Sequence, residues 1–338
     1  MRVPSKAWPS GEWRRHLSEA VGDVDELLKL VGLDDRRAQY GTPAAARGFP
    51  LRVPRGFAAR MRRRDPNDPL LRQVLPLGDE DSPAPGFTAD PVGELALAPT
   101  AGVLHKYRGR ALLVATGACA VHCRYCFRRH FPYGDIGGSV ADWQAAVELI
   151  ASDPEISEVI LSGGDPLTLP DVRVSELARR VVRVPHVRRL RIHTRLPIVL
   201  PQRVDEDLVA WLSHLDLPTV VVVHSNHAQE IDADVRRALA TLRATGVSLL
   251  NQSVLLAGVN DTADALVELS ESLFDAGVLP YYLHMLDLVE GAAHFEVSDK
   301  EAKNLHRQLT ARLPGYLVPR LVREVPGAPA KVGTDLWK

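Results

Sequence analysis

A sixfold alternation of short β-branched segments with amphipathic windows constrains the fold of this chain most. The predicted strands span 111–116, 158–163, 187–195, 219–225, 246–256 and 278–286. Helical windows follow them near 139–152, 172–184, 205–214, 231–244, 262–276 and 298–312. Repeated strand–helix units predict a parallel sheet covered by helices. Because six units are two short of a closed eight-unit barrel, a partial barrel and a doubly wound sheet both remain possible.

The first hundred residues differ in character from this alternating region. Apolar residues recur at helical spacing over 12–48, and 77–101 is rich in Pro, Gly, Asp and Ala. A basic stretch at 54–64 is interpreted as a solvated helix face rather than a binding patch. We expect three parts: a mostly helical region with a linker over 1–100, the barrel-like core over 101–312 and a C-terminal tail over 313–338.

Charge and hydropathy exclude several classes of protein. The 338 residues include 41 Lys and Arg against 42 Asp and Glu, so the net charge of −1 argues against a strongly cationic nucleic-acid binder. No apolar run reaches the roughly 18 residues that a membrane helix needs. The N-terminal residues have no apolar signal core, and a cytoplasmic location is expected.

The three cysteines give the clearest chemical signal. Cys119, Cys123 and Cys126 form a C-x3-C-x2-C motif directly after the first strand of the series. An odd number of cysteines on one short loop is a poor disulfide framework. Three thiolates can instead bind three irons of a [4Fe–4S] cluster and leave the fourth iron open. A zinc site completed by His122 or His130 is the less favoured alternative.

Polar side chains gather where the predicted strands end, which is where parallel α/β folds bind ligands. They come after five successive strands: Ser162 to Asp165, His193 to Arg195, His224 with Asn226 and His227, Asn251 with Gln252, and His284 with Asp287. Five such clusters at one end of a sheet predict a single site.

The cysteine motif and the Gly163-Gly164-Asp165-Pro166 stretch resemble those of radical S-adenosylmethionine (radical SAM) enzymes, whose core is a partial six-unit barrel. Six longer segments resemble the lysine 2,3-aminomutase family: CRYCFRRHFPYG (123–134), RIHTRLPIVLPQRV (191–204), HSNHAQEI (224–231), NQSVLLAGVND (251–261), PYYLHMLDLVEGAAHF (280–295) and PGAPAK (326–331). More narrowly, they resemble its short branch, which makes β-lysine for the modification of translation elongation factor P.

The resemblance implies an isomerase with three cofactors: a [4Fe–4S] cluster on the three cysteines, S-adenosylmethionine, and pyridoxal phosphate joined to Lys331 as a Schiff base. It places residues near S-adenosylmethionine at Gly163, Gly164, Asp165, His224 and Gln252. His193 and Arg195 are expected to hold the pyridoxal phosphate. Lys331 is one of only seven lysines among the 41 basic residues, so a lysine there is unlikely by chance.

Substrate residues are also implied by the resemblance. Arg128 matches the arginine that binds the substrate carboxylate, and Asp287 and Glu324 match the two acids that receive the side-chain ammonium. Glu324 stands where the free-lysine enzymes commonly carry aspartate. The chain lacks the further cysteines with which the longer relatives bind zinc, so no zinc is expected.

Two other readings stay open. The chain could move the amino group of another amino acid such as arginine, or it could be a non-catalytic module that binds an Fe–S cluster or zinc. The expected partners are free L-lysine, a flavodoxin- or ferredoxin-type electron donor and, through its product, elongation factor P and its lysyl ligase. A homo-oligomer is weakly favoured because related enzymes associate.

Overall fold

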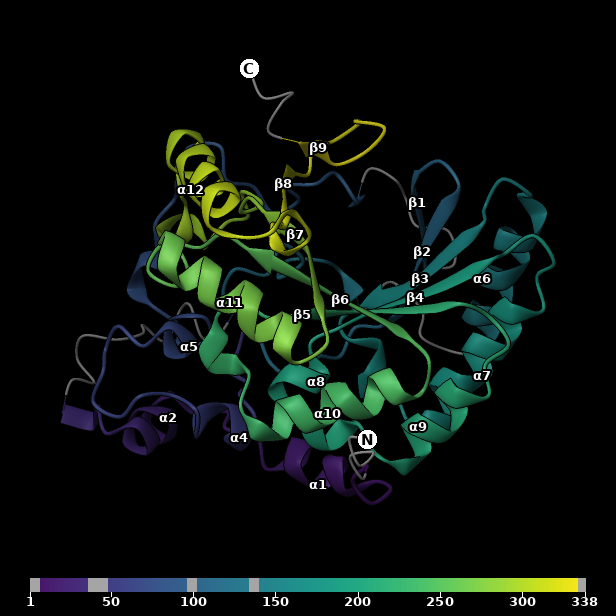
Figure 1. Ribbon diagram of the computed structural model, residues 1–338, viewed down its shortest axis with the longest axis horizontal. Helices are drawn as coiled ribbons and strands as arrows, with labels where there is room; N and C mark the ends of the chain where they lie inside the picture. Colours follow the sequence, from purple (N-terminus) through teal and green to yellow (C-terminus); the bar gives the residue numbers. More distant parts are fainter. Residues whose placement is uncertain (1–6, 36–47, 96–101, 134–139, 334–338) are drawn as a thin grey trace.

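The computed structural model describes residues 7–35, 48–95, 102–133 and 140–333. Its centre is one curved sheet of nine strands that follow one another in chain order (Figure 1). The seven middle strands are parallel: β2 (Arg110–Thr116), β3 (Glu158–Gly163), β4 (Arg189–Thr194), β5 (Thr219–His224), β6 (Ser248–Val254), β7 (Leu279–His284) and β8 (Arg320–Arg323). The edge strands β1 (Val103–Tyr107) and β9 (Val332–Gly333) are antiparallel to their neighbours.

Sequential strand order selects the partial barrel. In a doubly wound sheet the strand order reverses at one point, whereas here each parallel strand lies beside the one before it. The crossover helices therefore all lie on the outer face, as Figure 1 shows. They are α6 (Val140–Ser152), α7 (Asp171–Val182), α9 (Glu206–Ser213), α10 (Ala233–Ala244), α11 (Ala263–Asp275) and α12 (Asp299–Arg312). Because β1 and β9 stay at opposite edges, the barrel is open, and the prediction of a partial barrel is confirmed.

The predicted strands and helices are all present, with ends that differ by three residues or fewer. The sequence missed β1, β8 and β9. The four residues of β8, Arg-Leu-Val-Arg, are too few to show a period. This strand nevertheless extends the parallel sheet to seven members, because it pairs with β7 through Leu283 and Leu321.

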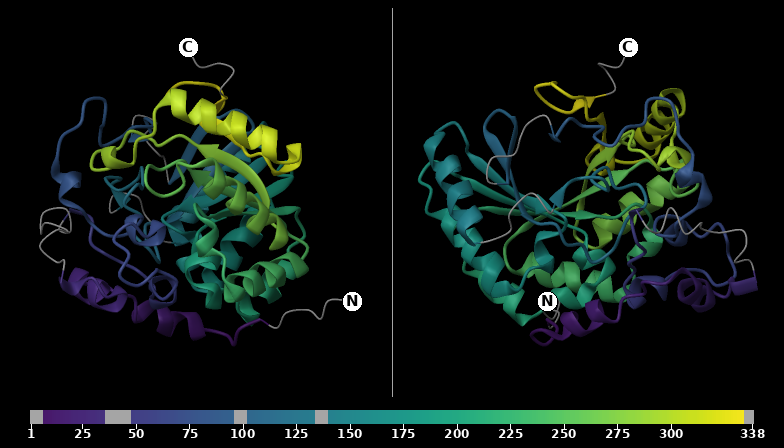
Figure 2. Two further views of the ribbon diagram at one scale, coloured as in Figure 1. Left: turned by 60° about the vertical axis from the view of Figure 1, so that its left-hand side comes forward. Right: turned by 180° about the vertical axis from the view of Figure 1, so that it is seen from behind.

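The N-terminal segment wraps the outside of the barrel (Figure 2). Its helices are short: α1 (Glu12–Ser18), α2 (Val24–Val31), α4 (Arg55–Ala58) and α5 (Pro69–Arg72). The helical region predicted over 12–48 is thus interrupted after α1, where Val21 pairs with Val53 in an isolated β-bridge. Residues 36–47 of that region lie outside the described residues. Within the basic stretch, the expected solvated face is wrong for Arg60, whose guanidinium donates to the carbonyl of Ile198 at 2.7 Å.

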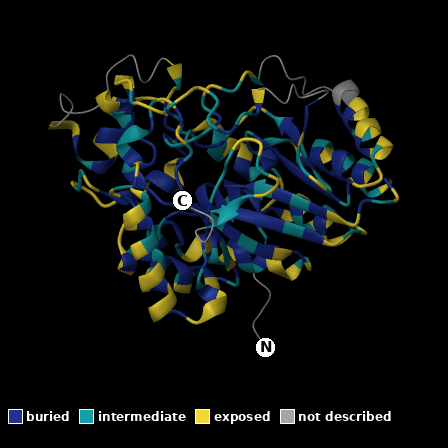
Figure 3. Ribbon diagram, turned by 90° about the horizontal axis from the view of Figure 1, so that it is seen from above, coloured by how far each residue is buried: buried dark blue, intermediate teal, exposed yellow. Residues whose placement is uncertain are grey.

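The core follows from this layering. Buried residues (dark blue in Figure 3) line the strands, while exposed residues gather on the outer helix surfaces and in loops. Trp13 of α1, Phe57 of α4 and Leu71 of α5 belong to the same buried apolar cluster as Leu161 of β3 and Val221 of β5. The N-terminal segment therefore shares its core with the barrel. No described helix combines the length and apolar character that a membrane span requires.

Two glycines bring the end of β3 against the start of the cysteine loop. Gly163 has φ of 118°, and an added Cβ would lie 2.4 Å from the carbonyl oxygen of Thr116. At Gly164 an added Cβ would lie 2.3 Å from the carbonyl oxygen of Ala118. The amides of Gly164 and Asp165 donate to these two carbonyls at 2.7 and 2.8 Å. The glycines thus fix the cysteine loop to the sheet.

Gly164→Ala is expected to lower the free energy of unfolding by about 3 kcal/mol, because the new methyl group overlaps backbone atoms that cannot move independently. Anaerobic urea unfolding measures this change. The matched control is Gly315→Ala, where an added Cβ meets no atom within 4 Å. Its effect should stay within about 0.5 kcal/mol. Equal effects of the two substitutions would contradict the steric argument.

Candidate active site

The cysteine loop presents three free thiols at the end of β2. Burial raises the pKa of Cys126 to about 11 and that of Cys119 well above its usual range. Thiols in such surroundings stay protonated unless a metal ionises them. Among the described residues, the groups whose ligand atoms converge closely enough for one ion do not include these cysteines. A cluster binds each thiolate through a different iron, so this spacing fits a cluster rather than a single zinc.

The two histidines that could complete a zinc site are engaged elsewhere. His122 stacks on Phe49, and its Nδ1 lies 2.8 Å from the carbonyl oxygen of Pro50. His130 is exposed and contacts the carbonyl of Glu290 at 3.4 Å. Both imidazoles thus make protein contacts away from the sulfur atoms.

Arginines of the cysteine loop pair with carboxylates of the N-terminal segment. Arg124 and Arg129 both donate to Glu80, which lies in the 3₁₀ helix η2 (Gly78–Asp81). Arg124 also uses its backbone amide, which donates to the carbonyl of Gln73 at 2.9 Å. Because these groups are almost fully buried, the ion pairs hold segment and loop together in one geometry.

Arg128, the expected carboxylate-binding residue, is already paired. Its Nε and Nη2 each lie 2.7 Å from the carboxylate of Glu94. Its Nη1 donates to Ser162 Oγ at 3.3 Å and to the carbonyl of Gly163 at 3.2 Å. A substrate carboxylate must therefore displace Glu94 or approach Arg128 from another side.

Asp165 joins the ends of β3 and β4. Its carboxylate accepts hydrogen bonds from the Thr194 hydroxyl and from the backbone amides of Leu167, Arg195 and Leu196, at 2.7 to 3.2 Å. Burial raises its pKa, and these hydrogen bonds oppose that shift. The structure thus places Asp165 as a brace between strand ends, with its oxygens directed to the backbone.

A second group of charges surrounds Lys331, which lies between β8 and β9. Glu324 contacts the ammonium groups of Lys331 and Lys106 and the hydroxyl of Tyr107. Burial alone would raise the pKa of Glu324, but Lys331 and these hydrogen bonds outweigh it and lower the pKa to about 2. Burial raises the pKa of Asp287 to about 7, with Lys331 opposing the shift. Glu324 is therefore the stronger acid of the pair, and a cation close to Asp287 would lower the pKa of that carboxyl.

Three histidines and a glutamine lie at or near the carboxyl ends of β4 to β7. The Nε2 atoms of His193 and His284 are buried and have no hydrogen-bond partner in the described structure. His224 Nε2 and Gln252 Nε2 lie 2.9 Å apart on paired positions of β5 and β6. Burial lowers the pKa of all three histidines, that of His224 to about 3. These neutral rings can donate or accept hydrogen bonds to a bound group.

A cavity of about 510 Å³ opens next to this second group. Its lining includes Asp287 and Glu324 together with Thr88, Met285 and Pro326. The volume is within the range of small-molecule sites, and four acids in its wall, Asp287, Glu296, Asp299 and Glu324, against one arginine, Arg323, suit a cationic ligand.

Arg195 does not join His193 as expected. It follows the last residue of β4 and has the helical values φ −104° and ψ −8°, so strand alternation has already ended there. Its Nη1 lies 2.7 Å from Cys123 Sγ. The structure thus directs the guanidinium of Arg195 to the cysteine loop, and its expected contact with pyridoxal phosphate stays a prediction.

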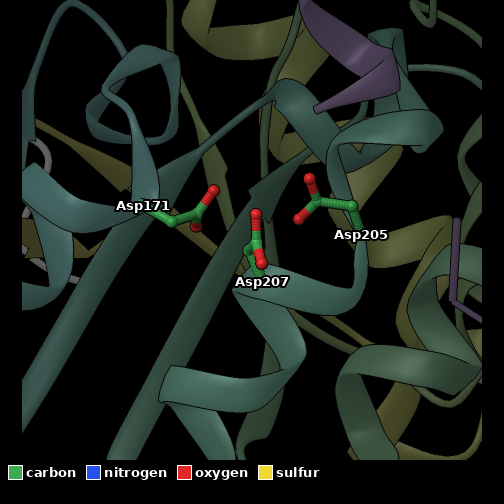
Figure 4. A group of neighbouring side chains, drawn as sticks. All are labelled: Asp171, Asp205 and Asp207. Atoms are coloured by element: carbon green, nitrogen blue, oxygen red, sulfur yellow. The ribbon is translucent and has the colours of Figure 1, made fainter. Parts of the chain in front are cut away.

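An acidic trio lies apart from both groups. Figure 4 shows Asp171, Asp205 and Asp207 facing one another, with ligand atoms within 4.8 Å. Arg203 already bonds to two of them, at 2.8 Å to Asp171 and 3.4 Å to Asp205. Asp205 also accepts from the amides of Gly11 and Leu208, and thereby ties the N-terminal segment to α9. The trio is an anchor of the fold, and we assign it no metal.

Sequence reasoning missed four functional neighbours: Glu80, Glu94, Lys106 and Tyr107. The two glutamates lie in a Pro- and Gly-rich segment that has no periodic pattern to indicate burial. The scarcity of lysine could have marked Lys106, because the same count singled out Lys331.

Comparisons with known proteins agree with this geometry. The model of the radical SAM superfamily matches residues 113–269. The L-lysine 2,3-aminomutase of Escherichia coli (strain K12) is 52% identical over 97% of this chain and 96% of its own length. The Haemophilus influenzae enzyme of the same name is 47% identical, with 94% of each chain covered. That of Clostridium subterminale is 33% identical over 95% of this chain and 77% of its own length.

An open barrel with three thiols after its first parallel strand, in a chain that matches the superfamily over that region, is a radical SAM enzyme. Within this class, the 52% identity to the Escherichia coli L-lysine 2,3-aminomutase over 97% of the chain identifies the family. The chain belongs to the lysine 2,3-aminomutase family, and it is an aminomutase, an isomerase that moves an amino group within its substrate. The family membership implies a [4Fe–4S] cluster, S-adenosylmethionine and pyridoxal 5′-phosphate as cofactors.

Glu94→Gln is expected to lower the free energy of unfolding by about 3–5 kcal/mol, because it leaves the Arg128 cation buried without a carboxylate. Anaerobic urea unfolding of Glu94→Gln, Arg128→Met and the double variant forms a double-mutant cycle. The double variant should be more stable than the sum of the single losses predicts. A surface control is Glu155→Gln, which removes the exposed pair with Arg108 and should have little effect. Additive losses would contradict a direct Glu94–Arg128 interaction.

Proposed function

We propose that this aminomutase converts L-α-lysine into β-lysine, and that the β-lysine is used to modify elongation factor P. The pair of acids in the wall of the cavity, Asp287 and Glu324, carries the substrate assignment, because two carboxylates suit a side-chain ammonium. The 52% identity to the Escherichia coli L-lysine 2,3-aminomutase supports the same substrate.

Cys119, Cys123 and Cys126 are the proposed ligands of the cluster. When bound, the cluster supplies the electron that cleaves S-adenosylmethionine and so generates the radical that starts the reaction. Gly163 and Gly164 have no side chains, so a cosubstrate can approach the backbone next to the cysteine loop. His224 of β5 and Gln252 of β6, which are paired across these two strands, are proposed to contact the same cosubstrate.

Lys331 is the proposed anchor of pyridoxal phosphate, which holds the migrating amino group when bound. The unpartnered Nε2 atoms of His193 and His284 fit such a polar group, and the ring of Tyr282 lies 5.9 Å from Lys331 Nζ. Glu324 also contacts Lys106, and we propose that it accepts the ammonium of the substrate.

Asp287 supplies the second charge of the ammonium site. Its pKa of about 7 means that about half of the groups are protonated near neutral pH. A substrate ammonium lowers that pKa, because an opposite charge nearby favours the carboxylate. Arg128 is proposed to bind the α-carboxylate after exchange with Glu94.

The pathway assignment rests on relatedness within the family. Identity to the Escherichia coli protein is 52%, against 33% for that of Clostridium subterminale. We therefore place the chain with the short relatives, in the cytoplasm, with an external flavodoxin- or ferredoxin-type electron donor.

An anaerobic assay tests the proposed reaction. The full chain, reconstituted with iron, sulfide and pyridoxal phosphate, is supplied with dithionite, S-adenosylmethionine and L-lysine, and β-lysine is followed by mass spectrometry. We expect β-lysine only when all cofactors are present, and none from Cys119→Ala, Cys123→Ala or Cys126→Ala. Cleavage of S-adenosylmethionine without β-lysine would contradict the lysine assignment, and L-arginine would then be the next substrate to test.

Lys331→Ala is expected to abolish the visible absorption band of covalently bound pyridoxal phosphate, because the anchoring amine is lost. Borohydride reduction of the unsubstituted protein, followed by peptide mapping, should place the label on Lys331. The matched control is Lys106→Ala, which removes the other lysine that contacts Glu324 and should leave the covalent band in place. A band that survives Lys331→Ala and disappears in Lys106→Ala would reverse the assignment.

A further inference from the structure

Arg195 is a buried cation in contact with one of the three cysteines. Its Nη1 lies 2.7 Å from Cys123 Sγ and 2.7 Å from the Tyr125 hydroxyl. The residue is 5% exposed. An arginine stays protonated under all ordinary conditions, so a permanent positive charge lies beside this sulfur.

Three residues from distant parts of the chain hold Arg195 in this position. Nη2 donates to Gln73 Oε1 at 2.6 Å and to Glu230 Oε2 at 3.0 Å. Asn226 donates through its side-chain amide to Gln73 Oε1 at 2.9 Å, and through its backbone amide to Glu230 Oε1 at 2.9 Å. Because Gln73, Asn226 and Glu230 are all buried, the guanidinium has a single fixed geometry.

We propose that Arg195 sets the reduction potential of the cluster by donating a hydrogen bond to the Cys123 sulfur. This inference rests on the proposed binding of the cluster by the three cysteines. Hydrogen bonds to the sulfurs and net charge are among the main determinants of Fe–S potentials. Reduction adds one negative charge to the cluster, so a neighbouring cation stabilises the reduced form and raises the potential.

Substitution of Glu230 should shift the reduction potential of the cluster in the direction opposite to substitution of Arg195. The Glu230 carboxylate accepts from Nη2 of Arg195, whereas Nη1 contacts Cys123, and the carboxylate offsets part of the positive charge. Removal of that negative charge leaves the reduced cluster better stabilised. Electrostatic tuning therefore predicts opposite shifts for substitutions at Arg195 and Glu230, whereas general disorder of the site predicts shifts of the same sign.

Redox titration of the reconstituted full chain, followed by electron paramagnetic resonance without substrate, tests the proposal. Arg195→Gln removes the charge and should lower the ratio of reduced to oxidised cluster about tenfold at a fixed solution potential. For a one-electron couple, that change is about 59 mV toward more negative potential. Arg195→Lys keeps the charge and should shift less, while Glu230→Gln should shift the potential in the positive direction.

The matched control is Arg203→Lys. Arg203 is also a fully buried arginine in ion pairs, but its partners are Asp171, Asp205 and the carbonyl of Leu167. Its substitution should leave the potential unchanged. Iron and sulfide content per chain is measured for every variant, so that loss of the cluster is separated from a shift in its potential.

The outcomes are distinct. A cluster-loaded Arg195→Gln that titrates at the unsubstituted potential would overturn the proposal, as would shifts of the same sign in Arg195→Gln and Glu230→Gln. If Arg195→Gln alone fails to load, Arg195→Lys and Glu230→Gln decide by their signs. An unsubstituted protein that binds no cluster would refute the proposed cysteine ligation, and the inference with it.

Discussion

Burial of positive charge around the cysteine loop is the constraint on which much of this structure depends. Arg124, Arg128 and Arg129 all lie within or directly after the loop and are almost inaccessible to solvent. Removing a cation from water costs several kcal/mol unless a carboxylate meets it in good geometry. The required carboxylates, Glu80 and Glu94, come from the first 95 residues. The N-terminal segment is therefore part of the site, because without it the loop would carry uncompensated buried charges.

Charge divides the interior into two regions with different chemistry. Around the cysteines, four buried arginine side chains pair with carboxylates, and one of them, Arg195, also donates to a cysteine sulfur, which suits a ligand set of thiolates. Around Lys331, the acids Asp287 and Glu324 line the cavity, and their pKa values shift in opposite directions, upward for Asp287 and downward for Glu324. Lys331 and Lys106 contact Glu324 and hold its pKa low, whereas burial dominates at Asp287 and raises its pKa. A cationic substrate near Asp287 would favour its ionised, negatively charged form.

The periodic strand–helix units predicted a parallel sheet covered by helices, and the resemblance to radical SAM enzymes added the partial barrel. The cysteine loop stood out because three thiols in eight residues have few other uses. Sequence reasoning missed contacts between residues that are far apart along the chain. The partner of Arg128 lies 34 residues away in a segment without periodicity, so nothing in the sequence linked Glu94 to it. Nothing in the sequence linked Arg195 to the cysteine loop either, because it follows the end of β4 at Thr194 and lies 72 residues from Cys123.

Strand β8 explains how a residue close to the end of the described chain reaches the centre of the site. It pairs with β7 through Tyr282 with Arg320 and His284 with Val322, which puts Glu324 just beyond the end of the strand. Side chains alternate between the two faces of a sheet, so a slip of one residue in this register would turn Glu324 away from Lys106 and Asp287. The β8–β9 hairpin then returns Lys331 to Glu324. The geometry of the substrate end therefore depends on the register of one four-residue strand, as the cluster end depends on two glycines after β3.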